Sequence, residues 1–296
     1  MRYIHFLLLI VSFIWGTSFV ATEIALRECS VVTLLILRLG TATVIFTICL
    51  LLRMNWKKNV NQKDIFSFFL IGTLGVSLYQ FLQITANQLS NASITSFFIS
   101  MHPILLTLFG FLFHKEKITK FKILGIAFGF VGTIFIATNG KFNFSSNINY
   151  LLAFLCLFAN SAMWASYSSL SKKMAQRYMP FDLTALTTVI GFLFLLPLIP
   201  VINESNILLE IKEFSFSTYL AIGYLSFFCT IFAYVLWLYC LKKMEISNAG
   251  YYLYLEPVFT ISVAPLFLSN QLTRFLIIGG IMIFTGLICI HVKSKK

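Results

Sequence analysis

The sequence predicts an all-α membrane protein with ten transmembrane helices in two inverted five-helix repeats and both termini in the cytoplasm. Three observations lead to this fold class: the composition, the spacing of the apolar runs and an internal repeat. Apolar residues make up 59% of the 296 residues and charged residues 11%, and the mean hydropathy is +0.89. This composition leaves too little polar surface to cover a soluble domain of this size.

The apolar runs have the length that a helix needs to cross the hydrocarbon of a bilayer, about 20 residues for about 30 Å. Short polar stretches separate them. In chain order we expect spans at 4–26, 32–52, 65–86, 92–113, 121–138, 149–171, 181–200, 217–240, 247–269 and 274–292. An even number of spans places both ends of the chain on the same side of the membrane.

The net charge of +12 is divided unequally between the two sides of this predicted topology. With the N-terminus inside, 17 of the 22 lysines and arginines fall in cytoplasmic segments and four fall in external ones. Short cytoplasmic loops of membrane proteins carry such an excess. We therefore expect a multi-pass protein of the cell inner (cytoplasmic) membrane, with the lipid bilayer as a partner and no nucleic acid.

The chain repeats itself around two prolines, Pro103 and Pro257. Aligned at these prolines without a gap, residues 103–136 and 257–290 share eleven identities over 34 positions. The halves are expected at 1–140 and 141–296, and Trp15 and Trp164 lie in the first helix of each. Because five is odd, the second half enters the membrane from the opposite side. Inverted repeats of this kind suit alternating access to a site at the midplane.

An ionisable residue precedes each of these prolines: His102 before Pro103 and Glu256 before Pro257. Charged groups inside a membrane are costly, and a helix-breaking proline frees backbone groups that lipid cannot satisfy. Both features are tolerated where they line a polar cavity. We therefore expect helix breaks at both prolines and a binding site there. For His102, packing with a hydrogen bond to a neighbouring helix is an open alternative.

The candidate substrate-binding residues combine this carboxylate and this imidazole with aromatic and amide side chains of the surrounding helices. A carboxylate beside aromatic faces favours an ammonium group. For the tyrosines and glutamine, core packing or interhelical hydrogen bonding is the alternative. The candidates are Trp15, Tyr79, Gln83, His102, Trp164, Tyr234, Tyr252 and Glu256.

Two further charges, Glu23 and Arg38, lie at similar depth on either side of the turn between the first two spans. We expect a structural ion pair between them rather than a substrate contact, because removing either charge would strand the other.

The sequence offers little support for catalysis, a metal or a cofactor. The six cysteines show no paired spacing, the only aspartates are Asp64 and Asp182, and the four histidines are scattered. Membrane-embedded enzymes need clustered acids, bases or ligands. No phosphate-binding GxxxxGK[ST] segment is present, so this chain does not hydrolyse nucleotides for energy. An enzyme is therefore a remote alternative, and no cofactor is expected.

Several segments together resemble the EamA-type branch of the drug/metabolite transporter superfamily. They are the Trp15-Gly16-Thr17-Ser18 stretch, Arg38, the proline-centred fourth and ninth helices, the 115–119 turn (Lys-Glu-Lys-Ile-Thr), the 254–259 segment and the glycine-spaced fifth and tenth helices. The resemblance covers the whole chain and implies ten helices around a central cavity that carries amino acids, related metabolites or drug-like amines, commonly outward. The chain departs from the family pattern at Lys115, usually glycine, and at Asn270, which stands where the second turn would have a glutamate.

The expected function is a secondary transporter that exports a small metabolite, an amino acid or related amine, by alternating access, with protons as a possible coupling ion. A uniporter or channel-like facilitator for cationic drug-like amines is the alternative. Sequence leaves the substrate, the coupling ion and the oligomeric state open.

Overall fold

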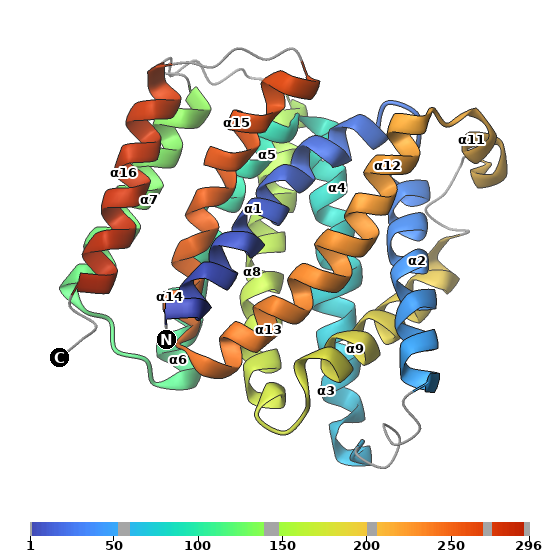
Figure 1. Cartoon of the computed structure of the whole chain (residues 1–296), viewed down its shortest axis with the longest axis horizontal. Helices are drawn as coiled ribbons and strands as arrows, with labels where there is room; N and C mark the ends of the chain where they lie inside the picture. The colour runs from blue at the N-terminus through green and yellow to red at the C-terminus, as the bar shows by residue number, and fades with distance from the viewer. Residues whose placement is uncertain (1, 53–59, 139–147, 200–205, 269–273, 293–296) are drawn as a thin grey trace.

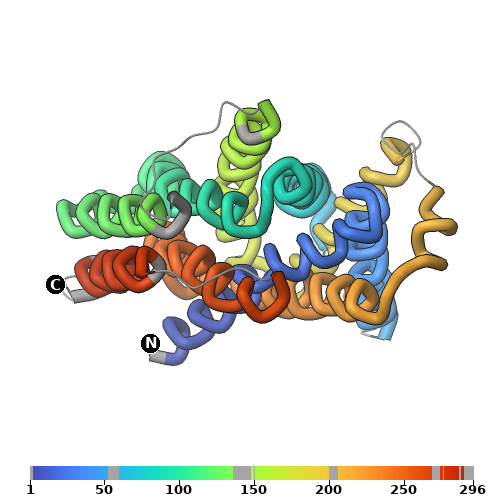
Figure 2. The backbone as a smooth tube through the Cα atoms, turned by 90° about the horizontal axis from the view of Figure 1, so that it is seen from above, coloured from blue at the N-terminus to red at the C-terminus, as the bar shows by residue number. Residues whose placement is uncertain are grey.

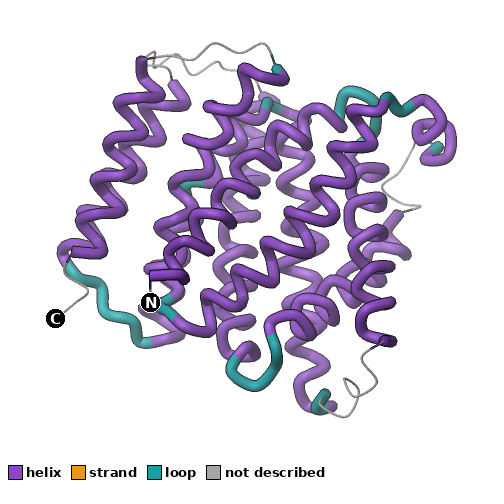
Figure 3. The backbone as a smooth tube through the Cα atoms, in the orientation of Figure 1, coloured by secondary structure: helices purple, strands orange, loops and turns teal. Residues whose placement is uncertain are grey.

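The computed structural model describes residues 2–52, 60–138, 148–199, 206–268 and 274–292. Helix makes up almost all of this part of the chain, and the described residues contain no strand (Figure 3). The helices stand in a thick layer and run between its two edges, and α1 begins and α16 ends at the same edge (Figure 1).

The first half of the chain contains five helical segments, two of which are divided. Segment three joins four short elements, and segment four changes direction before His102. The elements are α1 (Arg2–Ala25), α2 (Val31–Leu52), η2 (Gln62–Asp64), α3 (Ile65–Gly72), η3 (Thr73–Leu78), α4 (Tyr79–Leu89), α5 (Ala92–Ile99), α6 (His102–His114) and α7 (Lys120–Thr138).

The second half repeats the order of five helical segments and has a further α-helix, α11, between the second and third of them, which the sequence did not predict. Asn206 begins α11 by accepting a hydrogen bond from the Leu208 amide at 3.1 Å. The elements are α8 (Ile148–Ala175), α9 (Pro180–Leu195), η4 (Leu196–Leu198), α11 (Ile207–Glu213), α12 (Phe216–Tyr224), η5 (Leu225–Phe232), α13 (Ala233–Lys243), α14 (Ile246–Gly250), η6 (Tyr251–Leu255), α15 (Glu256–Phe267) and α16 (Arg274–Val292).

Seven helices in the described part of the chain are long and apolar enough to cross a membrane. The predicted total of ten spans therefore stays a prediction. The seven are Tyr3–Ala25, Val31–Leu52, Gln62–Leu89, Ala92–His114, Leu151–Ala175, Pro180–Leu198 and Phe216–Lys243.

A new helix begins one residue before each of the two prolines. Pro103 lies in the first turn of α6, and Pro257 lies in the first turn of α15. A first-turn proline costs little, because the amide hydrogen that it lacks has no partner within the helix. The helix breaks therefore fall immediately before His102 and Glu256, next to the two prolines at which the sequence predicts them.

The third segment of each half contains a stretch of π-helix, η3 in the first half and η5 in the second. In each, a hydroxyl donates to the carbonyl five residues earlier: Ser77 to Gly72 O at 3.4 Å, and Thr230 to Leu225 O at 2.9 Å. Single π-helical turns are rare and occur often at functional sites. The two halves place theirs at equivalent positions.

α7 and α16 pack against each other at one end of the elongated molecule, while α11 lies at the other end (Figures 1 and 2). Glycines allow the close approach. A Cβ on Gly132 would lie 2.7 Å from Gly279 O, and one on Gly286 would lie 2.8 Å from Gly125 O. Gly125 aligns with Gly279 and Gly132 with Gly286 in the internal repeat, so the contact is reciprocal, as a two-fold axis requires.

The outer surface is apolar and much of the interior is polar. Large apolar side chains are exposed on most of the long helices, including Phe6, Leu52, Phe66, Leu266 and Ile277. Serines, threonines, amides and several charged groups are buried between the helices. This distribution is typical of a protein whose outer surface contacts lipid.

Candidate functional site

Six aromatic side chains from four helices meet in the interior. We call them the ring cluster: Trp15 of α1, Tyr79 of α4, Trp164 and Tyr167 of α8, and Tyr234 and Trp237 of α13. Trp164 is central, with ring centroids 5.1 Å from Trp15, 4.9 Å from Tyr79 and 5.0 Å from Tyr167. The cluster includes four of the sequence-predicted candidates. Tyr167 and Trp237 were missed, although each is one helical turn from a predicted member.

Polar atoms within the ring cluster are unevenly satisfied. Trp15 Nε1 donates to Cys229 O at 3.1 Å, and Trp237 Nε1 donates to Ser168 Oγ at 3.2 Å. Trp164 Nε1 is buried and has no hydrogen-bond partner among the described residues. A buried donor without a partner costs free energy, about 1–3 kcal/mol in typical cases. The centre of the cluster therefore retains a donor that a bound molecule would satisfy.

His102 lies beside the cluster and is held by a side chain of the other half. Its Nε2 lies 3.1 Å from Asn160 Oδ1, and Asn160 Nδ2 donates to Tyr79 O at 2.7 Å. The imidazole centroid is 6.0 Å from Tyr79 and 5.9 Å from Trp164. His102 is thus a buried histidine with an interhelical hydrogen bond, which is the alternative left open by sequence, and it borders the rings as well.

Glu256 is the first residue of α15 and is only 3% exposed. Its carboxylate has no hydrogen bond and no ion pair with the described residues, although its main-chain oxygen accepts from Thr260 Oγ1 at 2.8 Å. Gly16 allows α1 to touch this turn, because a Cβ there would lie 2.7 Å from Glu256 O. Gly16 follows Trp15, so this contact places the carboxylate-bearing turn next to the ring cluster.

Glu23 and Arg38 have separate partners in the structure. Glu23 Oε2 accepts from the Ala92 amide at 2.7 Å, at the start of α5. Arg38 is buried at 3% exposure, and its Nε donates to Thr230 Oγ1 at 2.9 Å in η5. The expected ion pair between them is not formed in this conformation, because α5 and η5 supply the nearer groups.

Two further candidates, Tyr252 and Gln83, are not members of the ring cluster. The Tyr252 hydroxyl lies 2.7 Å from His5 Nδ1, near the start of α1, and its main-chain oxygen accepts from Ser12. Gln83 is buried on α4, one turn beyond Tyr79. On the same helix Asn87 donates to Phe19 O at 3.0 Å, so this amide joins α4 to α1.

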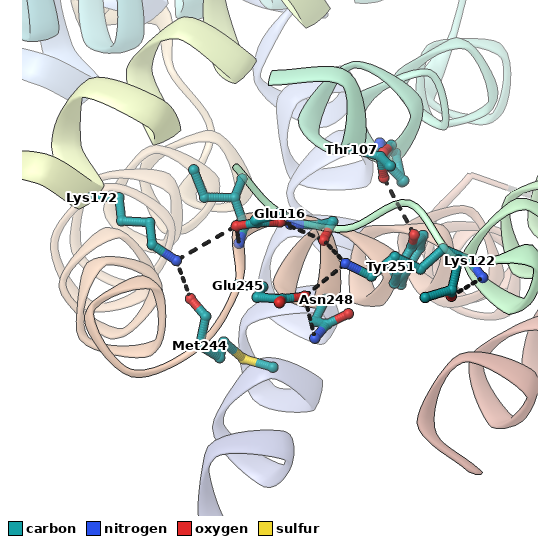
Figure 4. A network of polar contacts seen from close by, with 12 residues as sticks. Thr107, Glu116, Lys122, Lys172, Met244, Glu245, Asn248 and Tyr251 are labelled. Carbon is teal, nitrogen blue, oxygen red and sulfur yellow. Dashed lines mark hydrogen bonds and ion pairs between the residues drawn. The ribbon is translucent and has the colours of Figure 1, made fainter. Parts of the chain in front are cut away.

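A second polar network lies near the turn between α6 and α7 (Figure 4). The buried Glu116 carboxylate accepts from the Ile246 amide at 2.6 Å and from the Ser247 amide at 3.1 Å, at the first residues of α14. Lys172 of α8 lies 3.7 Å from Glu116 and donates to Met244 O. We call this set, with Lys122, Glu245 and Ser247, the turn network.

The turn network uses the electrostatics of a helix start. The free amides and the dipole at the N-terminus of a helix favour a carboxylate. Lys122 of α7 completes the set by donating to Glu245 at 2.6 Å and to Ser247 Oγ at 2.7 Å. The network therefore fixes α6, α7 and α8 to the beginning of α14 and the end of α13. In the sequence, the only indication of the turn network is the 115–119 turn, which resembles the family pattern.

A cavity of about 520 Å³ lies at the opposite edge of the helix layer, where α1 ends and α2 begins. It is lined by Leu26, Arg27, Glu28, Cys29, Ser30, Gln88, Glu210 and Glu213. The Ser215 amide donates to Glu28 at 2.7 Å and holds the pKa of that carboxyl below its usual value. Burial raises the pKa of the Cys29 thiol to about 12. Gln88 of this lining lies on α4, directly after the buried Asn87.

The described residues contain no group of three or more histidine, cysteine or acidic side chains placed to hold a metal ion. The functional groups in and around the ring cluster are one carboxylate, one guanidinium, one imidazole and several aromatic faces, all of which can bind a small molecule.

The model of the EamA-like transporter family matches residues 2–138 and 151–292. This chain belongs to the EamA-like transporter family. The membership agrees with the resemblance seen in sequence, and it makes this a multi-pass membrane protein of a transporter family.

Relatives of this EamA-like chain extend over nearly its whole length. An uncharacterized transporter of Archaeoglobus fulgidus is 28% identical over 295 residues, 99% of this chain and 98% of that protein. A protein of Streptantibioticus cattleyicolor, described as a probable terminal-alkyne amino-acid exporter, is 23% identical and covers 95% of this chain and 90% of its own. A solved crystal structure superposes with a TM-score of 0.79 at 17% identity and covers 99% of this chain, which shows a shared fold.

Proposed function

We propose that this protein is a secondary transporter that exports an amino acid or related amine across the cytoplasmic membrane by alternating access. The observation that carries the proposal is the Glu256 carboxylate: nearly buried, without a partner among the described residues, and beside the ring cluster. A buried carboxylate in that state is costly unless a cation or proton binds it. An ammonium group supplies the charge, and the aromatic faces add cation–π attraction.

In this proposal the chain forms ten spans in two inverted repeats, 1–140 and 141–296. Three features support the division: breaks before His102 and Glu256, π-helical segments at equivalent positions, and the reciprocal α7–α16 contact. The family model also matches the chain in two segments. Trp15 and Trp164, one from each first helix, touch at the centre. A site between two similar halves is the arrangement that alternating access requires.

The lysine and arginine distribution places both termini, and with them the turn network, on the cytoplasmic side in this proposal. The turn network then closes the cytoplasmic edge, as does the pair of Arg177 with Asp64, 2.9 Å apart. The cavity beside Cys29 lies on the external side. This conformation is thus one of two, and breaking the turn network is part of the exchange.

Transport in proteoliposomes tests the proposal. Purified protein is first screened by thermal shift against the twenty L-amino acids and a set of primary amines, because a ligand of the folded state raises the melting temperature. The best stabilising compound is then used for counterflow. We expect saturable counterflow in the wild type and its loss in Glu256→Gln. Asp182→Asn, which changes a carboxylate in the first turn of α9 outside the ring cluster, is the matched control and keeps transport.

Two outcomes contradict the proposal in different ways. Full binding and counterflow in Glu256→Gln remove that carboxylate from the site. Flux without saturation or counterflow indicates a channel-like facilitator instead of a carrier. Repeating the assay with an imposed proton gradient distinguishes a proton-coupled exporter, which accumulates substrate against its gradient, from a uniporter, which does not.

A further inference from the structure

Two buried side chains of opposite charge border the ring cluster, and neither is neutralised. Glu256 and Arg38 are each 3% exposed. Within the described part of the chain, the carboxylate has no hydrogen-bond partner, and Arg38 donates only through Nε, to Thr230. Neither forms an ion pair with the other. Such groups are normally paired when buried, because an isolated charge is costly in a medium of low polarity.

Two short series of contacts bring both residues close to Trp15. Arg38 Nε donates a hydrogen bond to Thr230 Oγ1. The residue before Thr230 is Cys229, and its carbonyl oxygen accepts a hydrogen bond from Trp15 Nε1. The residue after Trp15 is Gly16, which packs directly against the main chain of Glu256. Arg38 of α2 and Glu256 of α15 therefore both lie near Trp15, at one border of the ring cluster.

A ligand that neutralises both groups must carry both charges. A guanidinium binds a carboxylate through two parallel hydrogen bonds, and it is suited to buried sites because it is weakly hydrated. A carboxylate binds an ammonium. The neighbouring side chains are aromatic, and among them Trp164 Nε1 and the Tyr167 hydroxyl have no hydrogen-bond partner in the described residues. Trp and Tyr rings bury large apolar areas, so an apolar side chain of the ligand packs well against them.

We propose that Arg38 binds the carboxylate of the substrate while Glu256 binds its ammonium, so that the site takes a zwitterionic α-amino acid with an apolar side chain. This inference rests on the proposed transport function and deepens it. It replaces the structural ion pair expected for Arg38 with a specificity role. Simple amines lack the group that Arg38 needs, and simple acids lack the group that Glu256 needs.

The wild-type protein tests this without any substitution. Three amino acids, L-leucine, L-phenylalanine and L-tryptophan, are compared with their decarboxylated amines, isoamylamine, phenethylamine and tryptamine, and with the deaminated acids 4-methylpentanoate, 3-phenylpropionate and indole-3-propionate. Affinities are measured by calorimetry in detergent. We expect at least one amino acid to bind more tightly than both of its analogues, by about tenfold or more, since each analogue leaves one buried charge unpaired.

Variants then assign the carboxylate contact. Arg38→Gln is expected to lose about tenfold or more in affinity for the amino acid and to change affinity for the amine little. Arg38→Lys keeps the charge without the planar fork and falls between. Lys117→Gln, an exposed lysine in the turn after α6, is the control and binds like the wild type. Should Arg38→Gln not fold, Arg38→Lys and the wild-type ligand series decide the question.

Equal binding of amine and amino acid overturns the role of Arg38 while leaving amine export intact. Binding of none of the three amino acids overturns the substrate class proposed here, and counterflow with another amine from the broader screen would still support the transport function. Loss of affinity for amine and amino acid alike in Arg38→Gln shows a structural role and also overturns the inference.

Discussion

Lys115 shows how a single residue can oppose local backbone preference. It follows α6 with φ 55° and ψ 30°, the left-handed region, and is the only non-glycine residue with positive φ in the described chain. Glycine favours this conformation after a helix because it has no Cβ to clash. The family pattern that this chain resembles usually has glycine at position 115, and the observed left-handed dihedrals explain that preference. Lysine is strained in this conformation.

Replacing Lys115 with glycine is expected to raise stability by about 1 kcal/mol, because the left-handed cost disappears. The measurement is the melting temperature in detergent. Lys117→Gly, two residues later in the same turn and without positive φ, is the control and should lower the melting temperature or leave it unchanged. A lower melting temperature in Lys115→Gly would show that the lysine side chain contributes more than the strain costs.

Cys29 at the cavity edge is expected to be nearly inert toward iodoacetamide in the folded protein. Thiolate is the reactive form, and with a pKa of about 12 only about one thiol in ten thousand is ionised at pH 8. Mass spectrometry of labelled peptides measures the rate, which should rise about tenfold per pH unit up to pH 10. Urea-denatured protein provides the fast reference, and equally rapid labelling of the folded protein would contradict the burial of this thiol.

At the scale of elements, helix contact in this molecule depends on small residues and on helix ends. Without a hydrophobic driving force in lipid, helices associate through close packing and hydrogen bonds. The glycines of α7 and α16 supply the first, and Glu116 at the start of α14 supplies the second. Both contacts join one half of the chain to the other.

Two glycines of α16 make opposite predictions for the same substitution. Gly286→Ala places a methyl group 2.8 Å from Gly125 O and should separate α7 from α16, which lowers the melting temperature. A Cβ on Gly280 meets no atom within 4 Å, so Gly280→Ala gains helix propensity, by up to about 1 kcal/mol. Thermal unfolding of the two variants compares them directly, and equal melting temperatures would exclude a tight glycine contact.

Glu116→Ala is expected to loosen the turn network and shift the molecule toward opening at that edge. The substitution leaves the Ile246 and Ser247 amides without their acceptor. Spin labels at positions 117 and 242, introduced in a cysteine-free background, report the separation of the α6–α7 turn from the end of α13. The distance distribution should lengthen or broaden in the variant. An unchanged distribution would limit Glu116 to local folding.

For the whole molecule, the charge asymmetry and the fold make a joint prediction about orientation. Seven described helices are long and apolar enough to span, and α1 begins at the edge where α16 ends. Reporter fusions to the C-terminus measure the side directly: a fluorescent protein should mature, and alkaline phosphatase should be inactive, if that end is cytoplasmic. The opposite result would reverse the sidedness of the turn network and of the cavity beside Cys29.

Much of the candidate site follows from local pattern. Trp15, Tyr79, Trp164 and Tyr234 were predicted from helix position and polarity, and they meet in the ring cluster. Tyr252 was placed there because it precedes Glu256 closely, but the 3₁₀ turn of η6 directs it to His5. Glu23 and Arg38, which the sequence predicts as an ion pair, contact Ala92 and Thr230 in this conformation, because depth along a helix does not specify the direction that a side chain faces.

The fold class, the order of the long apolar segments, the internal repeat and the helix breaks at the two prolines can be read from the chain, because apolar length and proline act locally. Which polar groups meet depends on the packing of the helices. The contact of Asn160 with His102, that of Glu116 with α14, and the approach of Arg38 and Glu256 to Trp15 depend on helix rotation and crossing. Those are set by packing among distant segments, which no local pattern of residues encodes.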